Sequence, residues 1–237
     1  KIKDEYSNFT TLNIVIIGKT GVGKSTLINT IFGQKLAETG IGKPVTQAIR
    51  KIEKKDIPLV LYDTPGMELK GDNTAQNLLD DVVDLINNGT ETGDVNQAIH
   101  CVWYCINASS GRIEPTEIQF LRDLAIKTKY CNVPLVVILT KSILKENVKQ
   151  IKEEIEKENL PIKKIIPVLS ENFPTDGGME IKAHGIEQLA WEMNDILPDY
   201  VKATFISIQD ASIALKQEKA RIVIKSTVIT VMAIGGL

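Results

Sequence analysis

The chain has 237 residues, and its 28 Lys and Arg against 30 Asp and Glu give a formal net charge of −2, which excludes a global basic field, so no specific nucleic-acid partner is expected. With 43% apolar and 24% charged residues, the composition excludes a disordered chain and a collagen-like repeat. Its 3 cysteines are too few for the disulfide framework of a secreted protein, so we expect a cytoplasmic protein.

The N-terminal part of the chain predicts a buried strand, a helix and a pair of antiparallel strands. Residues 12–17 form a nearly unbroken apolar run, typical of a strand covered on both faces of a parallel sheet. Residues 24–32 carry apolar side chains at helical spacing, and a glycine-rich loop joins them to that strand. Residues 48–54 alternate apolar with polar side chains and precede the apolar run 59–63, so we expect two antiparallel strands here, the first at the sheet edge.

Helical and strand patterns alternate through the middle of the chain. They are a helix over 73–88, a strand over 99–106, a helix over 116–129, a strand over 133–139, a helix over 146–158 and a strand over 164–169. Alternation of this kind predicts an α/β fold in three layers, in which helices cover both faces of one sheet. We expect a mostly parallel six-stranded sheet with one antiparallel edge strand.

Two further helical patterns follow the last predicted strand, over residues 185–197 and 200–232, with Pro198 between them. Because they lie beyond the sheet, we expect a core domain over 1–180 and a C-terminal helical extension over 181–237. The apolar end of this extension leaves two interpretations open. It is a helix end packed on the core, or it begins a membrane-associated region and the extension is truncated.

A phosphate-binding motif lies between the first strand and the first helix. Residues 18–25, Gly-Lys-Thr-Gly-Val-Gly-Lys-Ser, match the pattern G-x-x-x-x-G-K-S/T, and a strand before it with a helix after it is the context that identifies a P-loop. Backbone N–H groups of such a loop converge on phosphate oxygens, Lys24 reaches the β- and γ-phosphates, and the Ser25 hydroxyl binds Mg²⁺. The residues expected to bind the phosphates are Thr20, Gly21, Val22, Gly23, Lys24, Ser25 and Thr26.

A second motif, Asp63-Thr64-Pro65-Gly66, follows the strand over 59–63 at the edge where parallel sheets bind ligands. There Asp63 can hold a Mg²⁺-bound water, and the Gly66 N–H can sense whether a γ-phosphate is present. An ordinary turn after any strand can have the same composition. The P-loop that precedes it at this distance is what gives the motif its meaning.

A P-loop followed by Asp-Thr-Pro-Gly resembles the translation-factor-related class of P-loop GTPases, which includes Era-like, septin, Toc and GIMAP proteins. The resemblance covers about residues 12–171 and implies the P-loop NTPase fold, a GTP or GDP ligand and Mg²⁺. It also implies a threonine before the second strand that closes over the nucleotide and binds Mg²⁺. Thr46 lies in that position, and Thr39 is the competing candidate.

The base-recognition motif departs from this class. Its N/T-K-x-D pattern corresponds to Thr140-Lys141-Ser142-Ile143, so Ile143 replaces the aspartate that accepts hydrogen bonds from guanine. The Lys141 stem can still lie across the base plane. Ser170-Glu171, after the last strand, resembles the motif whose backbone N–H meets the guanine oxygen. We therefore expect guanine-nucleotide binding through these two motifs, and an ATP-using P-loop NTPase stays open as an alternative.

Two positions predict slow hydrolysis. Met67 stands where many GTPases carry a glutamine that orients water, and Gly21 stands where potassium-using Era-like members carry an asparagine. Gly21 instead resembles the septin, Toc and GIMAP arrangement, in which two GTPase domains face each other across their nucleotides. Arg112 resembles an arginine of GIMAP-type sequences, and we expect it to stabilise the transferring phosphate in trans. The alternative is a solvated arginine paired with Glu114 or Glu117.

These observations predict a Mg²⁺-dependent GTP-binding protein that hydrolyses GTP slowly and acts as a switch, activated by a nucleotide-dependent homodimer. The expected catalytic residues are Lys24, Thr46, Gly66 and Arg112, and the expected metal ligands are Ser25, Thr46 and Asp63. The alternative is a nucleotide-binding assembly scaffold with little or no hydrolysis. His100 and His184 have no carboxylate or cysteine at metal-ligand spacing, and neither is given a catalytic role.

Overall fold

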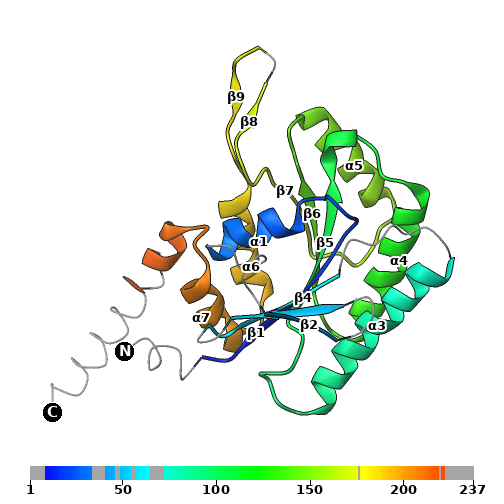
Figure 1. The fold of residues 1–237 in the computed structure, drawn as a ribbon, viewed down its shortest axis with the longest axis vertical. Coiled ribbons are helices and arrows are strands. Elements are labelled where there is room, and N and C mark those ends of the chain that lie inside the picture. The colour runs from blue at the N-terminus through cyan, green and yellow to red at the C-terminus, as the bar shows by residue number, and fades with distance from the viewer. Residues whose placement is uncertain are drawn as a thin grey trace.

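The computed structural model describes residues 9–33, 41–45, 49–54, 57–64, 72–175, 177–218 and 220–221. Its centre is one sheet in the strand order β2-β3-β4-β1-β5-β6-β7 (Figure 1). The strands are β1 (Leu12–Ile17), β2 (Ile41–Pro44), β3 (Arg50–Glu53), β4 (Leu59–Asp63), β5 (Cys101–Asn107), β6 (Leu135–Thr140) and β7 (Lys164–Pro167). Neighbours from β4 to β7 pair in parallel, and β3 pairs antiparallel with both β2 and β4.

The α/β fold class is confirmed, and each strand predicted from the sequence is present. The structure adds β2 outside β3, so that β2 forms the edge of a 7-stranded sheet. This strand is only 4 residues long and contains Gly42 and Pro44, which are rare inside strands, so its sequence carries no alternating pattern. It pairs with the row of backbone groups that β3 would otherwise leave open.

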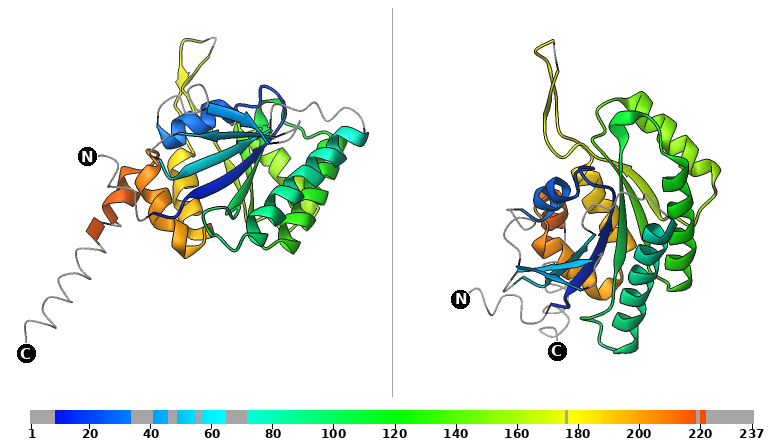
Figure 2. Two further views of the ribbon diagram at one scale, coloured as in Figure 1. Left: turned by 60° about the horizontal axis from the view of Figure 1, so that its bottom comes forward. Right: turned by 45° about the vertical axis from the view of Figure 1, so that its right-hand side comes forward.

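Helices cover both faces of the sheet (Figure 2). One face carries α1 (Lys24–Phe32), α6 (Ile186–Ile196) and α7 (Asp199–Ile208), and the other carries α3 (Asp72–Glu91), α4 (Pro115–Tyr130) and α5 (Lys145–Lys157). A 3₁₀ turn, η2 (Ala108–Ser110), follows β5, and a hairpin of β8 (Phe173–Pro174) and β9 (Glu180–Ile181) projects from the body after β7 (Figure 1). Within the described ranges, no helix combines the length and the apolar character needed to span a bilayer.

The first strand divides the core into two parts, as the period of a strand requires. Leu12, Ile14 and Ile16 belong to the core under α1, α6 and α7, whereas Val15 and Ile17 belong to the core under α3, α4 and α5. Every residue of β1 is buried, so its apolar run shows no alternation. This is the pattern of a strand covered on both faces.

The C-terminal helices α6 and α7 are part of the core and not an extension of it. Phe32 of α1 stacks on Trp103 of β5 with ring centroids 6.1 Å apart, and Phe205 of α7 meets Phe32 edge-on at 6.4 Å. The Trp103 indole also donates a hydrogen bond to the Met193 sulfur of α6 at 3.2 Å. A boundary after residue 180 therefore does not separate two cores, because α6 and α7 cover the same face of the sheet as α1.

The single helix expected over residues 200–232 is interrupted. After α7 the chain turns, and helical residues begin again at 213. In the turn, the buried Gln209 side chain accepts a hydrogen bond from the Ser212 N–H at 2.8 Å, and the Ser212 hydroxyl caps the next helical turn at 3.2 Å. Polar side chains that bond to nearby backbone in this way favour a cap over a continuous helix. The apolar end, residues 222–237, lies outside the described residues.

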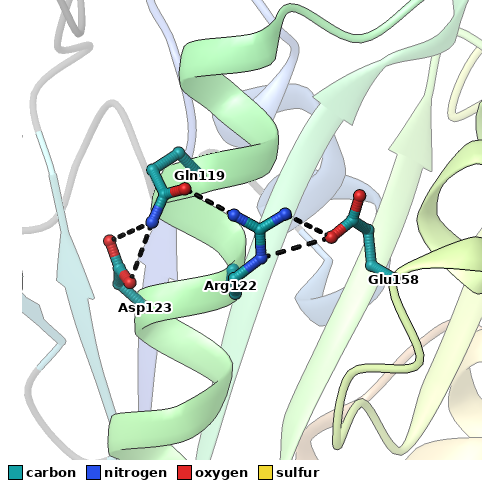
Figure 3. A network of polar contacts seen from close by, with 4 residues as sticks. All are labelled: Gln119, Arg122, Asp123 and Glu158. Carbon is teal, nitrogen blue, oxygen red and sulfur yellow. Dashed lines mark hydrogen bonds and ion pairs between the residues drawn. The ribbon is translucent and has the colours of Figure 1, made fainter.

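On the outer surface, α4 is joined to the C-cap of α5 by a polar network (Figure 3). The Arg122 guanidinium donates to the Gln119 side-chain oxygen and to the Glu158 carboxylate, and the Gln119 amide donates to the Asp123 oxygens at 3.1 and 3.0 Å. Because Arg122 and Glu158 are partly exposed, we expect their ion pair to add about 1 kcal/mol or less to stability.

Replacing Phe205 by alanine tests whether α7 belongs to the core. The ring is fully buried, so we expect Phe205→Ala to lower the free energy of unfolding by about 3–5 kcal/mol. The matched control is Tyr200→Ala on the same helix, whose residue is 50% exposed and should cost about 1 kcal/mol. Urea unfolding followed by circular dichroism measures both variants. Equally small losses would contradict a core position for α7.

Candidate functional site

Those predicted site residues that the structure describes gather around the carboxyl edge of the sheet. β1 pairs with β4 on one side and with β5 on the other, so the P-loop that follows β1 begins between two parallel neighbours. In this register Asp63 lies beside Ile16, and the next residue, Thr64, donates its N–H to the Ile16 carbonyl at 3.1 Å. The end of β4 thus lies at the root of the P-loop.

The loop after β1 presents its backbone to an anion. Gly23 is the N-cap of α1 with φ 103°, a left-handed conformation that favours glycine, and this N-cap gives the helix no side-chain hydrogen bond. The first turn of α1 carries no acidic side chain. A helix start of this kind keeps its N–H groups for an external acceptor, and its dipole favours negative charge. The predicted phosphate-binding residues, 20–26, all lie in this loop and this turn.

Lys24 is a buried cation held by the loop itself. The residue is 8% exposed, and its ammonium donates to the Gly18 carbonyl at 2.7 Å and to the Lys19 carbonyl at 3.4 Å. Burial lowers the pKa of Lys24, and the charge of Asp63 opposes that shift. A buried ammonium over the loop is therefore stabilised by any anion that enters.

Asp63 carries a buried oxygen that lacks a hydrogen-bond partner within the described part of the chain. Burial raises the pKa of Asp63, and the charges of Lys24 and Arg50 oppose the rise. A carboxylate oxygen of this kind, near Lys24 and its neighbour Ser25, suits Mg²⁺, which takes hard oxygen ligands and keeps several waters. The described ranges contain no group of 3 or more His, Cys, Asp or Glu that could hold a metal by themselves.

The loop after β6 braces the P-loop from the other side. The buried Thr140 hydroxyl donates to the Val22 carbonyl at 2.6 Å. Lys141, with φ 51°, donates its ammonium to the Gly21 carbonyl at 2.7 Å. Ile143 is half-buried and brings no carboxylate to this edge. Thr140 and Lys141 therefore order the P-loop backbone by bonding to its carbonyl groups.

Arg112 is exposed on the loop after η2, and it forms no ion pair with the residues that the structure describes. The sequence offers Glu114 and Glu117 as its alternative partners. In the structure both carboxylates bind Lys19 of the P-loop instead, at 2.7 and 3.0 Å. The Arg112 guanidinium is therefore left to solvent at the same edge as the P-loop.

The Lys19 contact joins the P-loop to the start of α4. Glu117 is 6% exposed, and burial raises its pKa while Lys19 opposes the rise. Burial lowers the pKa of Lys19, but hydrogen bonds to Glu114 and Glu117 outweigh this effect and leave it raised. Sequence reasoning missed the contact, because Lys19 fills a variable position of the P-loop pattern and lies 95 residues from Glu114.

The remaining predicted residues are placed only in part. Ser170 and Glu171 follow β7 at the same edge, with Ser170 half-buried and Glu171 exposed. Two surface cavities, about 430 and 460 Å³ in volume, lie beside the residues that precede β7, at the opposite edge, and contain none of the predicted site residues. Of the residues singled out in the sequence for the site, those that lie outside the described ranges are Thr39, Thr46, Gly66 and Met67.

Comparison with known proteins gives a matching family model, curated relatives and similar solved structures. A family model described as 50S ribosome-binding GTPase matches residues 13–170. Septin-9 of Homo sapiens is 27% identical over 135 residues, 48% of this chain and 23% of its own length. Cell division control protein 11 of Saccharomyces cerevisiae is 26% identical over 196 residues, 70% of this chain and 44% of its own length. The crystal structure of Cdc11 from the same yeast has a TM-score of 0.42 at 23% identity and covers 64% of each chain.

The chain thus spans less than half the length of these curated relatives, 23% and 44%.

Replacing Asp63 by asparagine tests the cost of its burial. Because the pKa of Asp63 is raised above its usual 3.8, the folded chain binds more protons than the unfolded chain above that pH, and stability falls as pH rises through the raised pKa. We expect Asp63→Asn to remove this fall and to raise the free energy of unfolding at neutral pH by about 1 kcal/mol.

Urea unfolding from about pH 4 to about pH 8, without nucleotide or Mg²⁺, measures the difference between the two chains. Asp195→Asn, at an exposed position on α6, is the matched control and should change little. If the difference in the free energy of unfolding between Asp63→Asn and the unchanged chain does not grow with pH, the burial of the Asp63 charge is not its cause.

Proposed function

We propose a slow, Mg²⁺-dependent GTPase switch for this chain, which belongs to the 50S ribosome-binding GTPase family of GTP-binding P-loop proteins. The proposed reaction is attack of water on the γ-phosphate of GTP, with no covalent intermediate on a side chain. The observation that carries the proposal is a pair of side chains: Lys24, whose ammonium bonds to P-loop carbonyls, and Asp63, whose buried Oδ1 has no hydrogen-bond partner among the described residues. Lys24 is a buried charge and Asp63 is a half-buried one with a buried oxygen, and a nucleotide with Mg²⁺ would complement both.

The phosphate end of the proposed site rests on Lys24 and the first turn of α1. When a triphosphate enters the loop, the ammonium exchanges the Gly18 carbonyl, now at 2.7 Å, for phosphate oxygens. Both bonds have an ionised donor, but a phosphate oxygen also brings a full opposite charge to a partly buried site, so the exchange is favourable. The N–H groups at the start of α1, which receive no side-chain cap from Gly23, supply further donors. These groups would stabilise the negative charge of the transferring phosphate.

Ser25 and Asp63 are the proposed Mg²⁺ ligands within the described chain, and the sequence adds Thr46 to them. When bound, the ion would neutralise charge on the β- and γ-phosphate oxygens. Asp63 is suited to the role because its Oδ1 is buried without a hydrogen-bond partner among the described residues. The strain of that burial would be relieved in the loaded state.

The base end is proposed to use the two loops that follow β6 and β7. Thr140 and Lys141 hold the P-loop carbonyls, and the Lys141 stem would lie against the base. Since Ile143 offers no carboxylate, guanine would be selected by backbone groups near Ser170 and Glu171. Base selection would then depend on the position of the backbone more than on one side chain.

Hydrolysis is proposed to be slow, because Met67 follows the Asp-Thr-Pro-Gly motif and a thioether cannot orient water. Acceleration would come from Arg112 of a second copy of this chain. This role is supported by the ion pairs of Lys19, because Glu114 and Glu117 bind Lys19 and neither forms an ion pair with the exposed Arg112 guanidinium. An exposed arginine of this kind can donate hydrogen bonds to a phosphate bound by a facing chain.

Calorimetric titration of the nucleotide-free chain with GTP, GDP and ATP in Mg²⁺ tests the binding step. We expect the guanine nucleotides to bind more tightly than ATP, and Lys24→Ala to weaken GTP binding by about 100-fold or more. Lys152→Ala, at an exposed lysine of α5, is the matched control and should leave binding unchanged. Equal affinity for ATP would withdraw the guanine preference in favour of the ATP-using alternative. No binding of any nucleotide would overturn the proposal.

Turnover measured against protein concentration tests the second copy. We expect the rate per chain to rise as dimers form and Arg112→Ala to lower the highest rate by about tenfold or more, since arginine fingers contribute at least this much. Arg122→Ala on α4, which breaks the ion pair with Glu158 at the C-cap of α5, is the arginine control and should keep the rise. A rise that survives Arg112→Ala would exclude the trans role. Turnover near background at every concentration would favour the assembly scaffold.

A further inference from the structure

The segment between the β8–β9 hairpin and α6 lies against the loop that follows β7. Leu169 and His184 exchange two backbone hydrogen bonds, each 2.9 Å long, as an isolated antiparallel bridge. Next to it, the Ala183 N–H donates to the side-chain oxygen of Asn172 at 2.8 Å. The chain therefore returns from the projecting hairpin (Figure 1) and pairs with the residues on either side of Ser170 and Glu171.

The His184 ring extends this contact to the loop that follows β6. Its Nε2 lies 3.0 Å from the Ser142 carbonyl oxygen. A carbonyl oxygen only accepts, so Nε2 carries the hydrogen and donates it, in the neutral ring and in the protonated ring alike. The Ser142 N–H in turn donates to the Val168 carbonyl at 3.2 Å. Ser142 is thus held at both backbone groups: its carbonyl accepts from His184, and its N–H donates to Val168, which directly precedes Leu169.

Gly185 makes the close approach possible. It has φ 82°, and a Cβ at this position would lie 2.0 Å from the Pro167 carbonyl oxygen, which no side chain tolerates. The backbone after His184 is therefore pressed directly on the end of β7. This proximity fixes where the His184 ring can reach.

From these contacts we infer that His184 is a positioning residue for the base end of the nucleotide site. The inference rests on the proposed function, in which the loops after β6 and β7 recognise the base. Ile143 removes the carboxylate that would anchor a guanine by itself, so recognition depends on how these two loops are placed relative to each other. His184 forms hydrogen bonds with both loops and none with a P-loop residue in the described chain. It acts on the base end and not on the phosphate end.

Three probes separate the two ends in the full chain with Mg²⁺: GTP, ATP and inorganic tripolyphosphate, which has the phosphates without a base. His184→Ala removes the donor, His184→Phe keeps the ring without the donor, and His184→Gln keeps an amide donor. Met179→Ala, at a hairpin residue that is 75% exposed, is the matched control. Thermal unfolding of each variant checks that the fold is kept, and the comparison of Phe with Gln stands if the alanine variant fails to fold.

We expect His184→Ala and His184→Phe to weaken GTP binding by about fivefold, the size of one lost hydrogen bond, with tripolyphosphate binding unchanged. His184→Gln should recover most of the loss, and Met179→Ala should bind like the unchanged chain. If the unchanged chain binds ATP as tightly as GTP, we expect the same loss of affinity for both nucleotides.

Unchanged GTP binding in the alanine and phenylalanine variants would overturn the inference alone and leave the proposed function standing. An equal loss for tripolyphosphate would also overturn it, since the residue would then act on the fold or on the phosphate end. An unchanged chain that binds no nucleotide would overturn the proposed function, and the inference with it.

Discussion

The structure depends on a charge buried at the end of its central strand. The Lys24 ammonium is held by the Gly18 carbonyl at 2.7 Å, and the carboxylate of Asp63 on the adjacent strand supplies the opposing charge. Removing these ions from water is costly, and the contacts offset only part of that cost, since burial still lowers the pKa of Lys24 and raises the pKa of Asp63. Parallel pairing of β1 with β4 brings the two groups to one edge, although 39 residues separate them in the chain. The sheet order is therefore what makes this edge chemically different from the other.

Contacts to backbone order the loops around these charges. Thr140 and Lys141 bond to P-loop carbonyls, Lys19 bonds to Glu117 at the start of α4, and His184 bonds to the loop after β6. Each contact joins segments that are distant in the sequence. The conformational entropy of these loops is therefore lost during folding, and a ligand that binds them later does not have to supply it.

The sequence predicts the elements whose signals are local. The buried β1, the P-loop and the helix that starts at Lys24 follow from an apolar run, a glycine pattern and helical spacing in adjacent residues. The positions of α6 and α7 could not be predicted this way, because an apolar helix face does not say which sheet face it will cover, and Phe205 finds Phe32 only in the folded chain. The same holds for Lys19 with Glu117 and for His184 with Ser142, whose partners carry no shared motif. The turn at Gln209 was also missed, since a lone Gln and Ser inside an apolar helical pattern give a weak stop signal.

The stacked pair of Trp103 and Phe32 gives the chain an optical reporter of its own. Trp103 is fully buried, and Phe32 is the last residue of the helix whose first turn carries Lys24 and Ser25. Indole emission responds to the groups in contact with the ring, here Phe32 and the Met193 sulfur. The chain has 2 tryptophans, and the other, Trp191, is half-buried on α6. A displacement of α1 would therefore change the emission of one tryptophan more than the other, with no dye attached near the P-loop.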